Sequence, residues 1–456
     1  MMRRWLLFGG ILVLLASCKS DENTTTSNAK VAAGQESFTW GTGVRSQDIR
    51  LTEKASWSVT CDGDCRNWCY PVKTSGNSAS IPLWVSPNIT SKERSGKVTV
   101  TVGGSRQVIT VRQPAFTGDI DDYVYHLPVV FHVLYKDAGD ETQNIPESQF
   151  TKILAAVNEL YDDNQMNITF EMAKYDKDGE VLDEPGIIRH QVSFDEMDAK
   201  DFLGSSDDKY DQYVSYQLNL KKYINIFVFR FTQTDETITT LGLTTLPLVT
   251  KAHPLDGLTE TDRANDYTYL DQTWGVCINN QCIYEWQDEK TVNTRYIVAT
   301  MAHELGHYLG LLHTFSENEC SDDDYCDDTP VSDYYEYVDY ISEYIEKEQQ
   351  KAREQGEERI FSIKELATRT DCMTGEEFVA TNILDYTFTY NTDFTSQQFD
   401  RTRHVLKYSP LVPGPKLVDY NTVDDNMRSA SLPPHFNRPV PCPGVPARGK
   451  LPVVMR

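Results

Sequence analysis

The stretch from Ile297 to Phe315 reads IVATMAHELGHYLGLLHTF and constrains this 456-residue chain more than any other feature. His303 and His307 are four residues apart, so on a helix both imidazoles project from one face and can share one metal ion. Gly310 permits the turn that ends the helix, and this turn delivers His313 as a third ligand. Three protein nitrogens and one open position predict a catalytic zinc site, because structural sites close with four ligands.

Glu304 directly follows the first ligand, where its carboxylate reaches a water on the metal without being a ligand itself. Zinc lowers the pKa of water toward ~7 and polarises a carbonyl, so a glutamate general base can complete the hydrolysis of a peptide bond. The alternative, an amphipathic core helix with surface histidines, does not explain three histidines, a glutamate and a glycine in one register. Zinc-dependent hydrolysis is the predicted chemistry.

The charge balance narrows the classes of partner. The formal net charge is −25, which argues against nucleic acid or an anionic membrane surface as the main partner. The length suits two or three domains, each with its own core.

The N-terminus is typical of an export signal. Arg3 and Arg4 precede an apolar run over 5–15, which is too short for a stable transmembrane helix. The run ends Leu-Ala-Ser-Cys at 15–18 and resembles the lipobox of bacterial lipoproteins, which implies cleavage of residues 1–17 and lipidation of Cys18. The acidic pair soon after Cys18 resembles the surface-export signal of Bacteroidetes lipoproteins. We expect an exported outer-membrane lipoprotein at the cell surface, held by lipid alone; an ordinary signal peptide with an incidental cysteine is the alternative.

Residues 18–35 are rich in Ser, Thr, Asn, Asp and Glu and predict a flexible tether. Residues 36–115 predict a small all-β sandwich: 97–102 alternates, Gly-Gly makes a hairpin turn, and 107–111 returns. This region resembles the BACON domain, a β-sandwich of exported Bacteroidetes proteins for which carbohydrate contact is suspected. Its tryptophans either pack in the core or contact glycan: Trp57, Trp68 and Trp84.

From about residue 123 to 410 the pattern changes to α/β. Apolar strands are predicted at 127–135, 167–172 and 223–232, with an amphipathic helix at 148–164 that Ser148 caps. This order predicts a sheet packed against the zinc-ligand helix. A charged helical insertion is expected near 334–366, and the many prolines of 411–456 predict an irregular tail.

The surroundings of the zinc motif resemble the pappalysin (M43) family of metzincin metalloproteases. His313-Thr314-Phe315, Asp328-Thr329-Pro330 and the segment Asn382–Tyr386 match its motifs, and Phe394-Thr395 with Gln398 and Arg401 resembles the entry to its last helix. The resemblance covers roughly 125–408 and implies a zinc metalloendopeptidase of the EC 3.4.24 type that cleaves proteins or peptides.

One position departs from that family. Leu384 stands where the methionine of the Met-turn is expected, and leucine there conserves an apolar floor beneath the metal. Tyr386 stands where metzincins often hold a tyrosine that stabilises the tetrahedral intermediate, which implies a catalytic role; packing alone is the alternative.

The loop after the third ligand carries a second metal prediction. The family resemblance implies calcium here, and the alternative is a solvated acidic loop; the oxygen ligands on offer are Asp322, Asp323, Asp324, Asp327, Asp328 and Thr329.

Export permits disulfides, and the spacing predicts a small loop closed by Cys277 and Cys282. The family resemblance implies a staple from Cys320 to Cys372, with Cys320–Cys326 as the alternative. Cys61, Cys65 and Cys69 suggest disulfide pairing rather than a metal site.

These features predict a surface-anchored zinc endopeptidase. The rival is a non-catalytic surface lipoprotein that binds glycan or a host protein on a degenerate protease scaffold, and Leu384 is its only support in the sequence.

Overall fold

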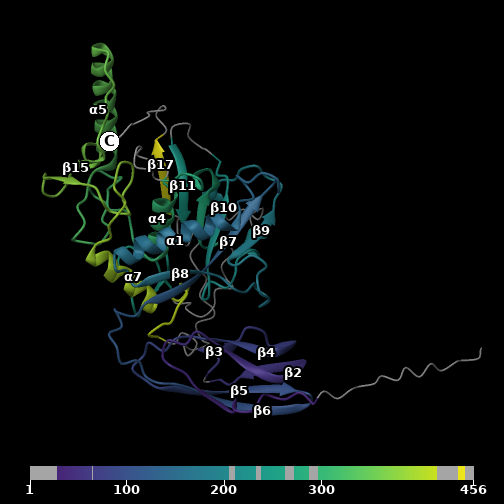
Figure 1. The fold of residues 1–456 in the computed structure, drawn as a ribbon. Coiled ribbons are helices and arrows are strands. Elements are labelled where there is room, and N and C mark those ends of the chain that lie inside the picture. The colour runs from purple at the N-terminus through teal and green to yellow at the C-terminus, as the bar shows by residue number, and fades with distance from the viewer. Residues whose placement is uncertain are drawn as a thin grey trace, which may run out of the picture.

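The computed structural model describes residues 28–63, 65–204, 211–232, 238–261, 272–286, 296–418 and 440–446. Residues 1–17, Cys18 and the first part of the expected tether lie outside these ranges. Two domains follow one another along the chain: an all-β domain, low in Figure 1, and a larger domain built around the zinc-motif helix. Among the described residues, no helix combines the length and apolarity needed to cross a bilayer.

The first domain contains only strands, as expected. They are β1 (Ser37–Thr39), β2 (Ser46–Cys61), β3 (Cys69–Pro71), β4 (Ser75–Val85), β5 (Arg94–Val102) and β6 (Ser105–Gln113). Buried and exposed residues alternate along β2, so one face of this strand points into the core. Because β2 pairs with both β4 and β5, the strands are linked by hydrogen bonds in the continuous order β1-β6-β5-β2-β4-β3.

The three tryptophans of this domain are core and interface residues. Trp57 and Trp68 are buried in its core. Trp84 is half-buried, and its ring centroid lies 5.9 Å from that of Tyr175 and 6.2 Å from that of Tyr223, both in the second domain. All three tryptophans therefore make packing contacts, either within this domain or with the second one.

The second domain is organised on one large sheet in the order β17-β11-β14-β10-β7-β8, with β9 also paired to β7. The strands are β7 (Tyr125–Tyr135), β8 (Ile168–Met172), β9 (Ile187–Gln191), β10 (Ile224–Phe229), β11 (Ile238–Thr244), β14 (Val276–Asn279) and β17 (Val440–Pro446). Neighbours pair in parallel except at β11, which runs antiparallel to both β14 and β17. Two small ladders join β12 (Val249–Thr250) to β13 (Glu260–Thr261) and β15 (Thr368–Thr370) to β16 (Glu377–Val379).

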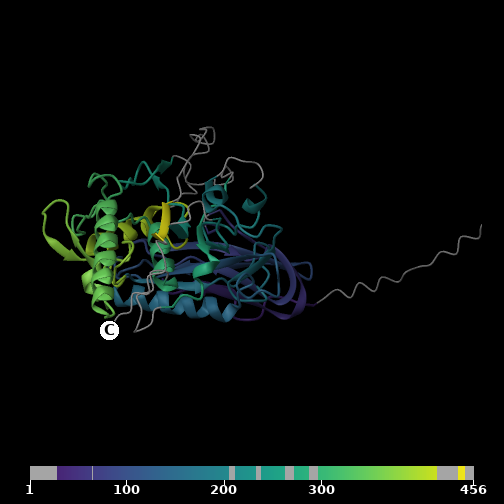
Figure 2. The same ribbon diagram turned by 90° about the horizontal axis from the view of Figure 1, so that it is seen from above.

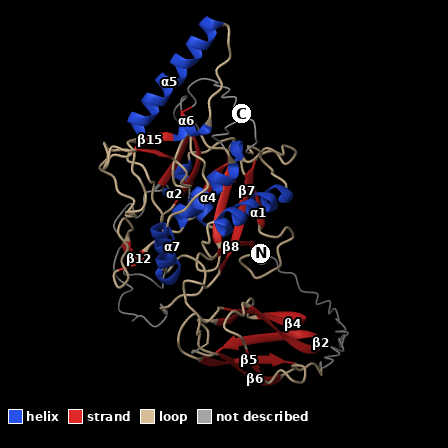
Figure 3. Cartoon of the chain, turned by 60° about the vertical axis from the view of Figure 1, so that its left-hand side comes forward, coloured by secondary structure: helices blue, strands red, loops and turns tan. Residues whose placement is uncertain are grey.

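The second domain also contains helices, some of which cover this sheet. They are α1 (Glu147–Asp163), α2 (Ala199–Gly204), α3 (Asp211–Val214), α4 (Ile297–Tyr308), α5 (Tyr334–Gln355), α6 (Ile363–Ala367) and α7 (Ser396–Tyr408), with a 3-10 turn at Asn280–Cys282. α1 and α4 pack together against one face, as Figure 3 shows, and α2 and α3 belong to the cluster on the other. All six residues of β10 are buried, as expected for a strand covered on both faces.

Two local expectations were wrong. α1 begins at Glu147 after Pro146, without a side-chain cap, so Ser148 lies inside the first turn and is not the cap. In the tail that was expected to be irregular, residues 440–446 form β17 at the edge of the large sheet. Proline is compatible with this place because an edge strand leaves every second N–H outside the ladder.

The insertion near 334–366 is helical and projects from the domain in Figures 1 and 2. Asp333 caps α5 by accepting the N–H of Glu336, and Gly356, at φ 69°, ends it in the left-handed conformation. Its buried residues Tyr337, Ile341 and Ile345 are spaced by about one turn and pack against Phe361, so only one face of the helix is anchored.

Candidate metal centre

The zinc-motif helix α4 is buried along its whole length, which fixes the direction of its side chains. At its end Gly310 has φ +92°, and a Cβ there would lie 2.6 Å from Cγ2 of Val405. The chain turns sharply at this glycine, and Arg401 donates to its carbonyl oxygen at 3.1 Å, which holds the turn against α7. This turn brings His313 back to the helix.

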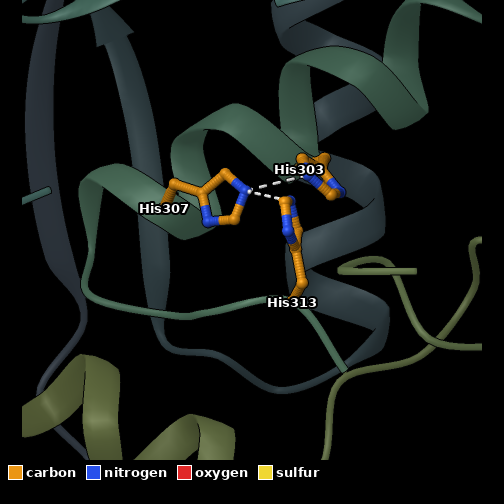
Figure 4. A group of neighbouring side chains, drawn as sticks. All are labelled: His303, His307 and His313. Atoms are coloured by element: carbon orange, nitrogen blue, oxygen red, sulfur yellow. Dashed lines mark hydrogen bonds between the residues drawn. The ribbon is translucent and has the colours of Figure 1, made fainter. Parts of the chain in front are cut away.

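The three motif histidines converge on one point, as Figure 4 shows. Nε2 of His307 lies 2.9 Å from Nε2 of His303 and 3.0 Å from Nε2 of His313. Among the residues that the structure describes, this is the only group of three or more His, Cys, Asp or Glu side chains whose ligand atoms lie close enough to hold one ion. For ligands ~2.0–2.1 Å from a tetrahedral zinc, nitrogen separations only slightly larger than these are expected.

The outer ring nitrogens decide which nitrogen faces the ion. Nδ1 of His303 lies 2.8 Å from the carbonyl oxygen of Ile383, and Nδ1 of His307 lies 2.8 Å from that of Leu311. Since a carbonyl only accepts, each Nδ1 carries the proton and each Nε2 presents a lone pair. Burial lowers the pKa of His307 to about 4 and that of His303 and His313 well below the usual value, which keeps all three rings neutral at pH 7. The residues fit a divalent metal with an affinity for imidazole.

Glu304 lies between the helix and strand β11. Its carboxylate is buried, and the hydroxyl of Thr244 donates both to it and, at 3.2 Å, to its backbone carbonyl. A Cβ on Gly242 would collide with this carboxylate, so only glycine allows β11 to pass here. Neither residue was predicted from the sequence to support the site, because 60 positions separate Thr244 from Glu304 and 62 separate Gly242 from it.

The turn that carries Leu384 and Tyr386 lies directly against the histidines. Leu384 is buried under α4, with Cδ2 3.2 Å from where a Cβ on Gly306 would be. The Tyr386 ring centroid lies 4.5 Å from that of His313 and 5.4 Å from that of His303. The structure therefore brings both residues to the site that their position in the motif predicts, and the catalytic role of Tyr386 stays a prediction.

A buried ion pair supports this turn and was not foreseen. Arg369 in β15 pairs with Asp385, donates to the carbonyl oxygens of Tyr386 and Phe388, and stacks 4.2 Å from the ring of Tyr337 on α5. The insertion is thereby connected to the turn that faces the histidines. The sequence carries no local signal for this pair, since 16 residues separate its members.

The disulfide predictions have different outcomes. Cys320 and Cys372 are bonded, with Cα atoms 5.9 Å apart, which excludes Cys320–Cys326. Cys277 and Cys282 are both buried thiols without a bond between them, so the predicted small loop was wrong: Cys277 lies in β14, and the Cys282 thiol donates to the carbonyl oxygen of Asn279. Cys326 is also a buried thiol, and Cys61, Cys65 and Cys69 form no disulfide, so the pairing predicted among them was wrong.

The predicted calcium ligands do not converge. Asp324 accepts from the hydroxyl of Thr329 at 2.9 Å, and Asp328 accepts from the N–H of Gln397 at the start of α7. Asp322 likewise accepts from the N–H of Glu317, and Asp323 from the N–H of Tyr325. Thr329 and these carboxylates thus make separate local contacts. Among the described residues, Asp327 belongs to no group of side chains close enough to hold one ion, and calcium is not supported.

Comparisons with known proteins agree with this geometry. Residues 207–407 match the family model Peptidase M43, described as pregnancy-associated plasma protein-A, and residues 55–114 match the model BACON. Both matches confirm the resemblances drawn from the sequence, and the first supports a metallopeptidase. No curated protein matches the chain.

Solved structures give weaker likenesses. A Bacteroides ovatus GH5 xyloglucanase in complex with a XXXG heptasaccharide is 14% identical, with a TM-score of 0.18, 46% of this chain covered and 56% of that enzyme. A protein from Bacteroides thetaiotaomicron is 18% identical with a TM-score of 0.16, and 22% of this chain and 97% of that one are covered. This chain therefore spans little more than half of the xyloglucanase, and TM-scores this low carry no argument about fold or function.

Proposed function

We propose that this chain is a zinc-dependent endopeptidase of the metzincin type, which hydrolyses peptide bonds in proteins. The observation that carries the proposal is the convergence of three neutral imidazoles, two of them buried, with their Nε2 atoms on one point. The match to Peptidase M43 over 207–407 supports the same class.

Bound zinc supplies Lewis-acid activation of water and of the scissile carbonyl. His303, His307 and His313 hold it, and the carbonyls of Ile383 and Leu311 fix the orientation of two of these rings. Glu304 takes the proton of the attacking water and passes it to the departing amine, while the Thr244 hydroxyl holds its carboxylate in place. Tyr386 donates to the oxyanion that develops in the transition state.

We also propose that lipid on Cys18 anchors the enzyme at the bacterial outer surface. The support is the sequence of the N-terminus and the match of residues 55–114 to BACON. Growing cells with a radiolabelled fatty acid and comparing the parent with C18A tests this part alone, because a protein that is not lipidated carries no label.

The test of the enzymatic proposal is Glu304→Ala against Glu343→Ala, which changes an exposed glutamate on α5. E304A is expected to keep one zinc per chain and to lose casein hydrolysis by ~10²–10⁴-fold, the usual contribution of a general base. E343A is expected to match the parent in both measurements. Cleavage by E304A at the parent's rate would refute the proposed mechanism.

A further inference from the structure

The edge of the large sheet nearest the candidate metal centre is already covered by the chain's own C-terminal segment. β11 is the strand that touches Glu304, through Thr244 and the backbone at Gly242. β17 pairs with its other side, antiparallel, with Gly242 opposite Cys442 and Thr244 opposite Val440. Figure 1 shows β17 beside β11 at this edge, and β17 also approaches α4.

An exposed sheet edge is a general docking site for an extended peptide, which binds by adding one strand. At this edge an added strand runs past the residue that holds the proposed general base. A substrate peptide and β17 would therefore compete for the same backbone donors and acceptors of β11.

We propose that β17 is an intramolecular blocker of the substrate edge, which keeps the enzyme latent until the segment is displaced or removed. This inference rests on the proposed peptidase function. Binding of β17 to β11 costs little entropy, because both strands belong to one chain and the effective concentration of β17 is therefore high.

The sequence of β17, Val-Pro-Cys-Pro-Gly-Val-Pro, suits a blocker that is not itself a substrate. Proline has no N–H, so in residues 440–443 only Val440 and Cys442 can donate to β11. Three of the six peptide bonds within the strand precede proline, whose fixed φ restricts the backbone on the far side of each bond. The strand thus pairs with β11 through alternate residues, and Pro441 and Pro443 offer no N–H on its outer side to a further strand.

The experiment compares the full zinc-loaded chain with a chain that ends at Pro439, using quenched fluorescent casein. Loss of 440–456 is expected to raise kcat/KM at least tenfold. A synthetic peptide of residues 438–448 is expected to inhibit the shortened enzyme in competition with casein. A matched peptide with neighbours exchanged (V440P/P441V/C442P/P443C) has the same composition. It carries proline at positions 440 and 442, where the N–H groups that can donate to β11 are lost, and it is expected not to inhibit.

Binding of the labelled 438–448 peptide, followed by fluorescence anisotropy, separates this inference from the peptidase proposal. Tighter binding to the shortened chain than to the full chain, with no hydrolysis by either, would support the occupied edge while the enzymatic proposal fails. Equal hydrolysis by both chains would overturn latency and leave the peptidase standing.

Two further outcomes also overturn the blocker. A shortened chain that melts earlier and cleaves no faster would make β17 an edge-protecting structural strand. Full-length C442S is expected to remain as latent as the parent; release of activity by this change alone would assign latency to the thiol and not to strand pairing.

Discussion

The two segments that the sequence offered as metal sites behave differently in the structure. The Nε2 atoms of His303 and His313 lie within 3.0 Å of Nε2 of His307. The acidic loop of 322–329 instead spreads its carboxylates over separate local contacts. On the helix, spacing dictates which side chains share a face. In a loop, closeness in sequence does not impose a common direction, and short polar side chains satisfy nearby backbone N–H groups instead.

The largest effect that tests this contrast is removal of a convergent ligand. His307→Ala is expected to weaken zinc binding by more than the ~10–100-fold that loss of a supporting hydrogen bond costs. Zinc content after dialysis and a competition titration with a chromogenic chelator measure it. His126→Gln, which changes a half-exposed histidine paired with Glu171, is the control and should keep one zinc. An unchanged zinc affinity in H307A would show that the histidine segment, like the acidic loop, does not form a metal site.

The next effect concerns Asp324, the buried carboxylate of the acidic loop. Burial raises its pKa to about 6, so between roughly pH 4 and 6 the folded chain binds a proton that the unfolded chain has released. The stability contributed by this group is therefore present below pH 4 and is lost as pH rises through 6. A bound cation would favour the charged carboxylate and lower its pKa, so the stability contributed by Asp324 would then rise with pH.

Asp324→Asn stays neutral at every pH and is expected to gain stability relative to the parent by up to ~3 kcal/mol between pH 4.5 and 7. Urea unfolding of both proteins at pH 4.5 and at pH 7 measures the free energy of unfolding. Asp323→Asn, at an exposed neighbour, should show no such pH-dependent difference. A parent that becomes more stable relative to D324N as pH rises would restore the calcium prediction.

A smaller effect tests whether Thr244 positions Glu304. Thr244→Val keeps the shape but removes the hydrogen bond to the carboxylate, and kcat/KM is expected to fall ~10-fold with zinc content unchanged. The acidic limb of the pH–rate profile should also move upward, because the carboxylate loses a donor that favours its charged form. Thr244→Ser should restore both properties. A fall in activity without any movement of that limb would indicate only a packing role.

The smallest expected effect is that of calcium itself. Calcium added to the zinc-loaded chain is expected to leave the melting temperature unchanged within ~1 °C. A ligand at 100 times its Kd would stabilise the fold by ~2.7 kcal/mol, which corresponds to a rise of several degrees. Such a rise, abolished in D324N, would contradict the loop contacts described above.

Local patterns predicted some elements well. The helix expected at the zinc motif is α4, and α5 begins at Tyr334, where the helical insertion was expected, because helical spacing is contained within the segment itself. Ser148 shows the limit, since Pro146 takes the cap position ahead of it.

Contacts between distant segments were not predictable in this way. Arg369 pairs with Asp385 across a turn, and Thr244 contacts Glu304 across 60 residues, so no periodicity marks either pair. The prolines of 440–446 argued against regular structure, yet an edge strand needs only alternate N–H groups. The ligands of the candidate site followed from local spacing, whereas the residues that support them depend on the whole fold.

The Cys320–Cys372 bond makes residues 320–372 a covalently closed ring, and the projecting helix α5 lies inside it. An exposed charged helix such as α5 is accessible to cleavage by other proteases. A cut between these cysteines leaves the two pieces joined, so the turn that carries Leu384 and Tyr386 stays attached to the histidine helix. The ring lets the exposed arm be nicked without separating the two halves of the candidate site.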